Sequence, residues 1–254
     1  VDQMIIFSYI NAMPRWQQCL LGATAAIATA AVLNRTFNKI LRNHGWYFQN
    51  LLELWDRLYL TAGIRFEENQ AFGFDANPKF GLAYLHRETG TKFKANFGTA
   101  FRAPTLNQLF FPNFGNPTLQ PEESVGFDFG LEQGLLSEKV SFGATYFYNY
   151  FDELIQSVPQ PGGGSLAENV GKSRSRGVEL EGTLRPFAHV ELKAFYTFLE
   201  AETIRDREPL IRRPKHSGGL TFHWKLTERV DWNVNLSVLD ERYDSTFATG
   251  RPRR

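Results

Sequence analysis

The feature that most constrains the fold of this chain is a two-residue alternation of apolar and polar side chains that recurs along most of its length. In residues 58–67, Leu60 and Ile64 belong to one face, and Thr61 and Arg65 belong to the other. Alternation with this period is the signature of a β-strand that has two different environments on its two faces. About ten segments follow it: 45–54, 58–67, 78–86, 91–102, 124–132, 140–150, 177–184, 190–198, 217–225 and 230–238.

The composition excludes several classes of protein. The 254 residues carry a formal net charge of +1, so nothing favours nucleic acid as a partner. The single cysteine, Cys19, cannot form an internal disulfide. After residue 40 no apolar run approaches the ~18 residues of a membrane-spanning helix. A transmembrane β-barrel remains open, because its strands alternate between lipid-facing and lumen-facing residues and give an ordinary mean hydropathy.

The lengths of the connections alternate between short and long. Short turns lie near residues 55–56, 88–90, 135–137, 186–188 and 226–228, and long loops lie between them at about 68–77, 102–121, 156–167 and 203–213. Short turns at one end and long loops at the other are typical of an outer-membrane barrel. We therefore predict an all-β fold, an antiparallel transmembrane β-barrel segment of about ten strands. A soluble β-sandwich is the alternative, since any single strand would suit its core equally well.

The loop between residues 101 and 122 is rich in proline and yet strongly apolar. Proline lacks an N–H group and disfavours helical geometry in the residue before it, so neither a strand ladder nor a helix continues through here. A loop with so much apolar surface must pack on something or bind something. Its large apolar side chains are Leu106, Leu109, Phe110, Phe111 and Phe114.

This loop resembles the barrel signature of TonB-dependent outer-membrane receptors, and within that family it is most similar to the cobalamin and siderophore receptors. Flanking segments at 58–65, 149–155, 176–182 and 210–217 resemble the same family in the same order. The positions that carry the resemblance are Phe101, Arg102, Ala103, Pro104, Asn116, Pro117, Pro121, Glu122, Gly177, Glu179, Arg213 and Pro214.

The resemblance implies transport across the outer membrane and no enzymatic activity. Such a receptor binds a scarce solute, a small molecule or a metal chelate, at its extracellular loops and imports it with energy from TonB. Its partners would be outer-membrane lipid, the solute and TonB, the last through a plug domain that this chain does not contain. A passive porin-like barrel and a soluble β-sandwich binding module remain alternatives. By position, the candidate ligand contacts are Phe110, Phe111, Asn113, Phe114, Gln156 and Gln160, although packing of the loops on themselves is an equal alternative.

No residue pattern indicates a catalytic site, a cofactor or a metal centre, because the five histidines are scattered without ligand spacing. We expect residues 45–254 to form part of a larger receptor barrel, since about ten strands are too few for the 22-stranded cylinder of this family. Residues 1–44 are an uncertain segment. Their alanine-rich stretch near 20–31 suggests a secretory signal, a helix, or sequence foreign to the native fold.

Overall fold

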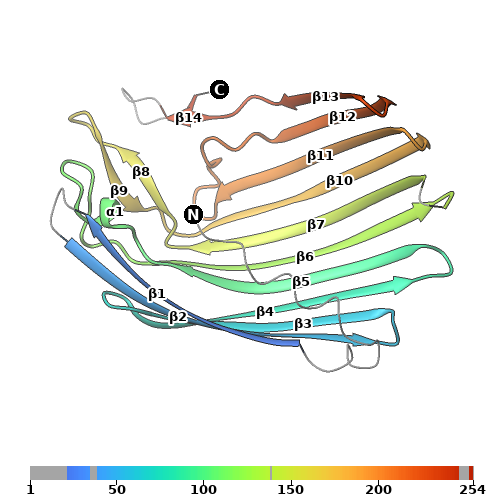
Figure 1. The fold of residues 1–254 in the computed structure, drawn as a ribbon. Helices are drawn as coiled ribbons and strands as arrows, with labels where there is room; N and C mark the ends of the chain where they lie inside the picture. Colours follow the sequence, from blue (N-terminus) through green and yellow to red (C-terminus); the bar gives the residue numbers. More distant parts are fainter. Residues whose placement is uncertain (1–21, 35–38, 138, 246–251, 254) are drawn as a thin grey trace.

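Most of the chain forms one curved antiparallel sheet of eleven strands in a computed structural model that describes residues 22–34, 39–137, 139–245 and 252–253 (Figure 1). The strands lie in the order β1-β2-β3-β4-β5-β6-β7-β10-β11-β12-β13, so neighbours in space are almost always neighbours in sequence. Such an up-and-down order is the topology of a barrel wall. The two outermost strands of the described sheet are β1 and β13.

The strands of the sheet are long, and the additional elements are short. The sheet strands are β1 Gly22–Asn34, β2 Lys39–Leu54, β3 Leu58–Asn69, β4 Gly73–His86, β5 Thr91–Arg102, β6 Glu122–Leu135, β7 Val140–Asp152, β10 Ser173–Phe187, β11 Val190–Thr203, β12 His216–Thr227 and β13 Val230–Leu239. The other elements are helix α1 Leu106–Phe110 and the strand pairs β8 Ile155–Pro159 with β9 Ser165–Asn169, and β14 Asp244–Ser245 with β15 Pro252–Arg253.

All ten predicted strands are present, from β2 to β7 and from β10 to β13, and β1 is an eleventh. The alanine-rich stretch is therefore not a helix where the structure describes it. Residues 22–34 pair along β2, which itself begins at Lys39, so the sheet extends to the N-terminal side of the boundary predicted at residue 45. The signal-like residues before Gly22 lie outside the described residues.

The long loop predicted at 68–77 is wrong. β3 and β4 form a hairpin that continues to Asn69 and Gly73. Asn69 closes its turn, because its side-chain oxygen accepts hydrogen bonds from the N–H groups of Ala71 (2.9 Å) and Phe72 (3.2 Å). Pro78, the first residue of the strand predicted at 78–86, lies within β4, next to the point where pairing with β5 ends at Lys79.

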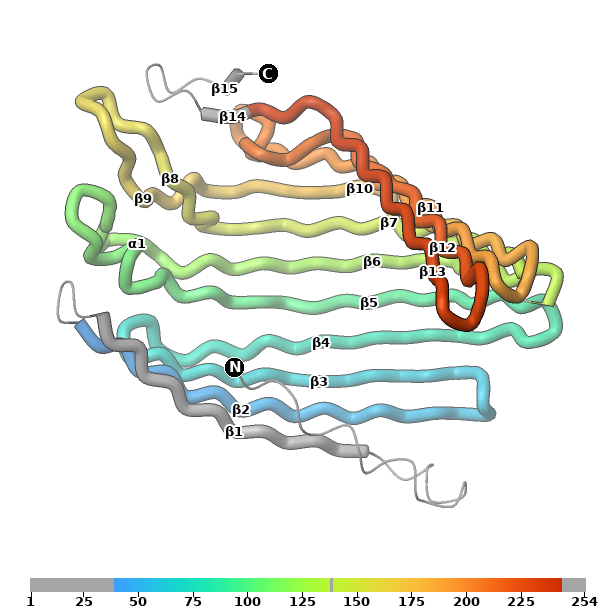
Figure 2. The backbone as a smooth tube through the Cα atoms, turned by 45° about the horizontal axis from the view of Figure 1, so that its top comes forward, coloured from blue at the N-terminus to red at the C-terminus, as the bar shows by residue number. Residues whose placement is uncertain are grey.

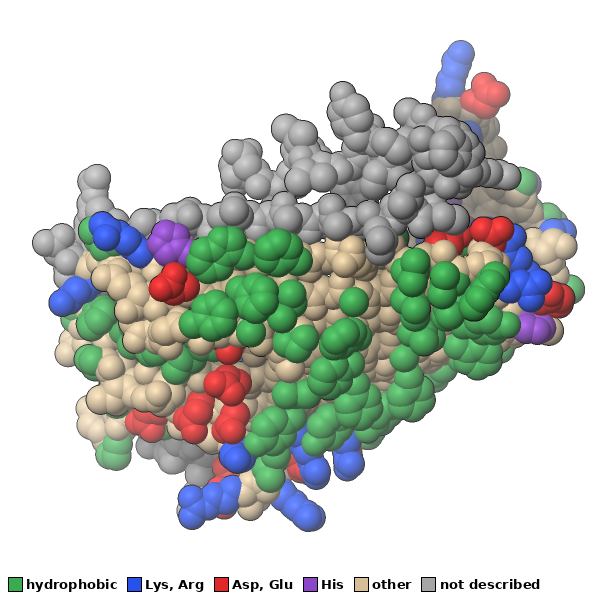
Figure 3. Space-filling view, turned by 90° about the horizontal axis from the view of Figure 1, so that it is seen from below, with side chains coloured by type: hydrophobic (Ala, Val, Ile, Leu, Met, Phe, Trp, Pro, Cys, Tyr) green, Lys and Arg blue, Asp and Glu red, His purple; other side chains and the backbone are tan. Residues whose placement is uncertain are grey.

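The two faces of the sheet differ as the alternation predicts. Directly paired residues share a face, and on the outer face Phe80, Phe97 and Phe127 follow one another across β4, β5 and β6. All three are more than two-fifths exposed, and Figure 3 shows hydrophobic side chains gathered on this side of the sheet. The opposite face carries polar partners such as Asn96 and Asp128, joined by a hydrogen bond of 2.9 Å. An apolar outer face and a polar inner face suit a wall between lipid and a lumen.

The turns and loops separate to the two ends of the sheet. Helix α1 and the β8–β9 hairpin lie at one end, and short turns join the strands at the other (Figure 2). No second large sheet packs on the eleven strands in the part of the chain that the structure describes, so the β-sandwich alternative is wrong. None of the described helices is long and apolar enough to span a membrane. The buried apolar side chains lie mainly at the loop end and include Leu106, Leu109, Leu119, Ile155 and Ala167.

Candidate functional site

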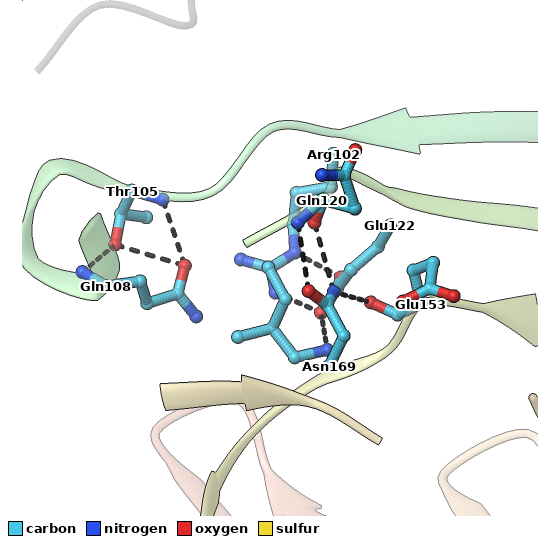
Figure 4. Close-up of polar contacts among 8 residues, drawn as sticks. Arg102, Thr105, Gln108, Gln120, Glu122, Glu153 and Asn169 are labelled. Carbon is cyan, nitrogen blue, oxygen red and sulfur yellow. Dashed lines mark hydrogen bonds and ion pairs between the residues drawn. The ribbon is translucent and has the colours of Figure 1, made fainter. Parts of the chain in front are cut away.

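The proline-rich loop between β5 and β6 holds one short helix, and its own side chains define that helix. Thr105 is the N-cap of α1, and its hydroxyl accepts a hydrogen bond from the Gln108 N–H (3.2 Å). The Gln108 side chain accepts the Thr105 N–H in return (2.9 Å), which completes a capping box (Figure 4). Pro104 before the cap is fully buried. The loop is therefore a fixed structure.

The apolar residues of this loop pack against the β8–β9 hairpin. The cluster consists of Leu109 and Leu119 from the loop and of Ile155 and Ala167 from the hairpin, each at most 8% exposed. The partly buried side chains of Leu41, Phe72, Phe110 and Phe114 surround it. Packing within the loops, one of the two interpretations left open above, accounts for most of the apolar surface.

Hydrogen bonds join the same two segments. The Ala167 N–H donates to the Phe114 carbonyl (2.9 Å), and the Asn116 side chain donates to the Ala167 carbonyl (3.0 Å). The Asn169 side chain accepts the Gln120 N–H (2.9 Å) and donates to the carbonyls of Gln120 (3.1 Å) and Glu153 (2.6 Å; Figure 4). The Asn169 side chain, at the end of β9, thus connects the β5–β6 loop to the residues that precede β8.

An ion pair closes the base of the loop where β5 ends and β6 begins. Arg102 and Glu122 are direct cross-strand partners, and the guanidinium donates to both carboxylate oxygens of Glu122. One of those oxygens also accepts the Ile155 N–H (2.7 Å). A two-point arginine–carboxylate contact is the strongest form of exposed ion pair. The family-motif residues Arg102, Asn116 and Glu122 therefore hold the loop conformation.

The remaining motif positions lie in three parts of the fold. Phe101 is on the outer face at the end of β5, and Ala103, Pro117 and Pro121 belong to the loop itself. Gly177 in β10 lies beneath the ring of Phe147, where a Cβ atom would come within 2.7 Å of the ring. Glu179 is on the inner face beside Thr145 and Thr197, and Arg213 and Pro214 precede β12.

The six predicted ligand contacts do not form one cluster. Phe110 and Phe114 pack on the loop cluster, and the Lys39 ammonium lies 5.3 Å from the centre of the Phe110 ring. Phe111 is 45% exposed, and Asn113 is an exposed residue with a positive φ of 61°. Gln160 donates to the Glu168 carboxylate (2.8 Å) within the hairpin. Gln156 lines a groove, and that groove is the best candidate for a binding site.

The groove has a volume of about 680 Å³ and lies between the β8–β9 hairpin and the β11–β12 loop. Gln156, Asn169 and Lys172 line it on the hairpin side, and Ile204 and Asp206 line it on the loop side. The two sides meet where the Ile204 N–H donates to the Lys172 carbonyl (2.9 Å). This volume lies within the range of small-molecule sites, roughly 300–1,000 Å³.

The groove offers both signs of charge. A hydrogen bond with Tyr150 and then the carboxylate of Asp152 raise the pKa of Lys172, which keeps this lysine cationic. Arg205, Asp206 and Glu208 also line the groove, and all three are exposed. In the described residues, no three His, Cys, Asp or Glu side chains cluster as they would around a metal ion.

The sequence pointed to only one groove residue, Gln156. Asn169, Lys172, Ile204 and Asp206 have no recognisable motif, because the groove exists only where two loops meet. Residues 156–167 were predicted as a long loop, whereas the structure forms the strand pair β8–β9 within it. Gly163 and Gly164 adopt positive φ angles at the tip of this hairpin, 89° and 80°.

Residues 12–252 match the family described as TonB dependent receptor-like, beta-barrel. Among solved structures, the siderophore receptor PirA from Pseudomonas aeruginosa superposes with a TM-score of 0.70 at 20% identity, over 87% of this chain and 42% of that one. The ferric enterobactin receptor PfeA from the same organism gives 0.69 at 21% identity, over 83% and 34%. The copper transporter OprC gives 0.63 at 17% identity, over 80% and 37%. The chain therefore spans well under half the length of these structures.

Proposed function

The chain belongs to the TonB-dependent receptor family of outer-membrane β-barrels, which are transporters and not enzymes, and we propose that it forms part of the wall and the extracellular loops of an active-import receptor. The receptor binds a scarce solute at the loop end and imports it with energy that TonB delivers. The solute contacts the groove between the β8–β9 hairpin and the β11–β12 loop.

The observation that carries this proposal is the fixed geometry of the groove wall. The hairpin is joined to the β5–β6 loop by the apolar cluster and by the three hydrogen bonds of Asn169. A wall that is ordered before binding loses less conformational entropy when a ligand binds, so its contacts contribute more fully to affinity.

We infer that the solute is a metal chelate of the siderophore or cobalamin type. The structural neighbours are named as receptors for siderophores and for ferric enterobactin, and as a copper transporter. A chelate presents oxygen acceptors and peripheral polar groups, which the Lys172 ammonium and the Gln156 amide can bind. The groove holds no cluster of metal ligands in the described residues, which favours a chelate over a free ion.

Energy dependence separates an active receptor from the passive alternative. Cells that express the protein should accumulate a radiolabelled ferric siderophore or cobalamin, and accumulation should stop when a protonophore collapses the inner-membrane gradient. Deletion of TonB should have the same effect. Uptake that continues unchanged after both treatments would refute active import and support a passive barrel.

Two matched lysine variants test the groove. Lys172→Gln should weaken binding of the solute about tenfold, the loss expected for one charge-assisted hydrogen bond. Lys225→Gln is the control, because Lys225 is also exposed but lies at the opposite end of β12. Equal affinities of the two variants, measured by titration of purified protein, would exclude the groove as the binding site.

A further inference from the structure

The outer face of the sheet carries two ion pairs where a lipid-facing wall should be apolar. In β10, Arg174, Arg176, Val178 and Leu180 are alternate residues and therefore share one face. Val178 pairs with Tyr146 and Phe198, which places this face with the apolar outer side. The same register places Arg176 beside Glu200 and Arg174 beside Glu202. We call these two ion pairs the outer rungs.

The outer rungs lie at the extracellular limit of the apolar band. Charged side chains on the lipid face of a barrel cost about 2–4 kcal/mol at the bilayer midplane and about 0–1 kcal/mol near the interface. The rungs occupy the first residues of β10, directly after the hairpin segment, and the last residues of β11, directly before the β11–β12 loop. They therefore belong at the level of the lipid headgroups.

The geometry of the rungs leaves the arginines available to a second partner. The Arg174–Glu202 and Arg176–Glu200 contacts measure 2.6 Å and 2.9 Å, and the Arg176 side chain is 43% exposed. Exposed pairs of this kind contribute little to stability on their own. A guanidinium has five N–H donors, so a carboxylate that holds it in place leaves donors for a phosphate group.

A hollow beside the rungs adds two more cations. It has a volume of about 220 Å³ and is lined by both rung glutamates and Glu241 together with Arg213, Lys215 and Tyr243. The Lys215 ammonium lies 5.5 Å from the centre of the Phe198 ring, which belongs to the outer face just below the rungs. Four cationic and three acidic side chains thus meet at the border between apolar and polar surface, which leaves an excess of one positive charge.

We propose that the outer rungs and this hollow bind the phosphate groups of a phosphorylated glycolipid in the outer leaflet. The acyl chains of the lipid cover the apolar band, and its phosphates contact Arg174, Arg176, Arg213 and Lys215. The source is a lipid and not free phosphate, because the cations lie directly above a surface that only acyl chains would cover. The inference rests on the proposed function for the orientation of the barrel in the membrane.

The test is the amount of phosphorylated glycolipid that copurifies with the protein from outer membranes, measured by mass spectrometry. A variant with Arg174→Gln, Arg176→Gln, Glu200→Gln and Glu202→Gln removes both rungs without changing the net charge. We expect its affinity for diphosphorylated lipid A to fall about tenfold for each arginine removed, because the phosphate groups lose the charge-assisted hydrogen bonds of that guanidinium. The control, Lys94→Gln with Glu132→Gln, removes a 2.6 Å pair on the inner face and should retain the lipid.

A second variant, Arg213→Gln with Lys215→Gln, leaves the rungs intact and should also lose lipid. Undiminished lipid in both outer variants would overturn the inference, as would equal loss in the inner control. Inorganic phosphate at 10 mM should neither displace the lipid nor raise the melting temperature, and if it does so as well as lipid A, the site is one for free phosphate. A protein absent from the outer membrane would refute the proposed function, whereas unchanged lipid in a membrane-inserted protein would refute this inference alone.

Discussion

The side chain of Asn169 should control how firmly the β8–β9 hairpin is held against the β5–β6 loop. It makes three hydrogen bonds of 2.6–3.1 Å, all to backbone groups of Gln120 and Glu153, and it is half-buried. Net contributions of such bonds are about 0.5–1.5 kcal/mol each, and water can reach part of the site. Asn169→Ala should therefore cost about 2 kcal/mol of local stability, which raises the open population of the hairpin about 30-fold.

Amide hydrogen exchange measures this opening directly. In Asn169→Ala, protection of the Ala167 N–H, which donates to the Phe114 carbonyl, should fall about 30-fold, the ratio that 2 kcal/mol implies. In Asn169→Asp the protection of the Ala167 N–H should fall further, because a carboxylate oxygen then faces the two carbonyls to which the amide had donated. Asn235→Ala on β13, which removes one exposed hydrogen bond that the Thr221 hydroxyl of β12 donates, should leave the loop unchanged. Unaltered protection of Ala167 in both Asn169 variants would refute the role assigned to this side chain.

Three further predictions concern the loop cluster, the wall and a turn. Leu119→Ala removes a side chain that is only 2% exposed and should cost about 2–4 kcal/mol, seen as faster proteolysis of the loop, whereas Leu119→Met should cost under ~1.5 kcal/mol. Gly177→Ala should lower the folded yield because the new Cβ would overlap an aromatic ring and a carbonyl, while Gly182→Ala on the same strand meets nothing within 4 Å and should fold normally; equal yields would contradict this. At the turn between β4 and β5, a hydrogen bond from its own backbone N–H and then Arg57 lower the pKa of Glu88 below 4.5. The Arg57–Glu88 ion pair should thus persist at neutral pH and be lost as the pH falls through the lowered pKa of Glu88. In Arg57→Gln, the midpoint of the Glu88 titration, followed by NMR, should rise part of the way back towards 4.5. An unmoved midpoint would exclude Arg57 as a cause of the lowered pKa.

The wall of the barrel could be predicted well from sequence because its pattern is local. Successive side chains of a strand point to opposite faces, and residues an even number of positions apart share a face. Leu60 and Ile64 therefore reveal the outer face without knowledge of any partner strand. The family signature at 101–122 is local in the same sense. The loop predicted at 68–77 was wrong because β3 and β4 pair as far as Asn69 and Gly73, a contact between two strands that the pattern of one segment does not reveal.

The loop end could not be predicted in this way, because its contacts join residues far apart in the sequence. Gln120 and Asn169 are 49 positions apart, and Asn116 and Ala167 are 51 apart. Such pairs meet only after β6, β7 and the hairpin have fixed the positions of the chain between them. The predicted ligand contacts Phe110 and Phe114 were chosen by their position in the loop, and only the packed structure shows that they contact the loop cluster.

The sequence alone determined the class of fold, the two faces of the wall and the family, because period-two alternation and a contiguous motif are properties of neighbouring residues. Only the tertiary structure shows that β1 pairs with β2, that the hairpin packs on the β5–β6 loop, and that a groove lies beside the hairpin. It also shows where along β10 and β11 the outer rungs lie. These features depend on strand register and on contacts between distant loops, which side-chain chemistry along the chain does not encode.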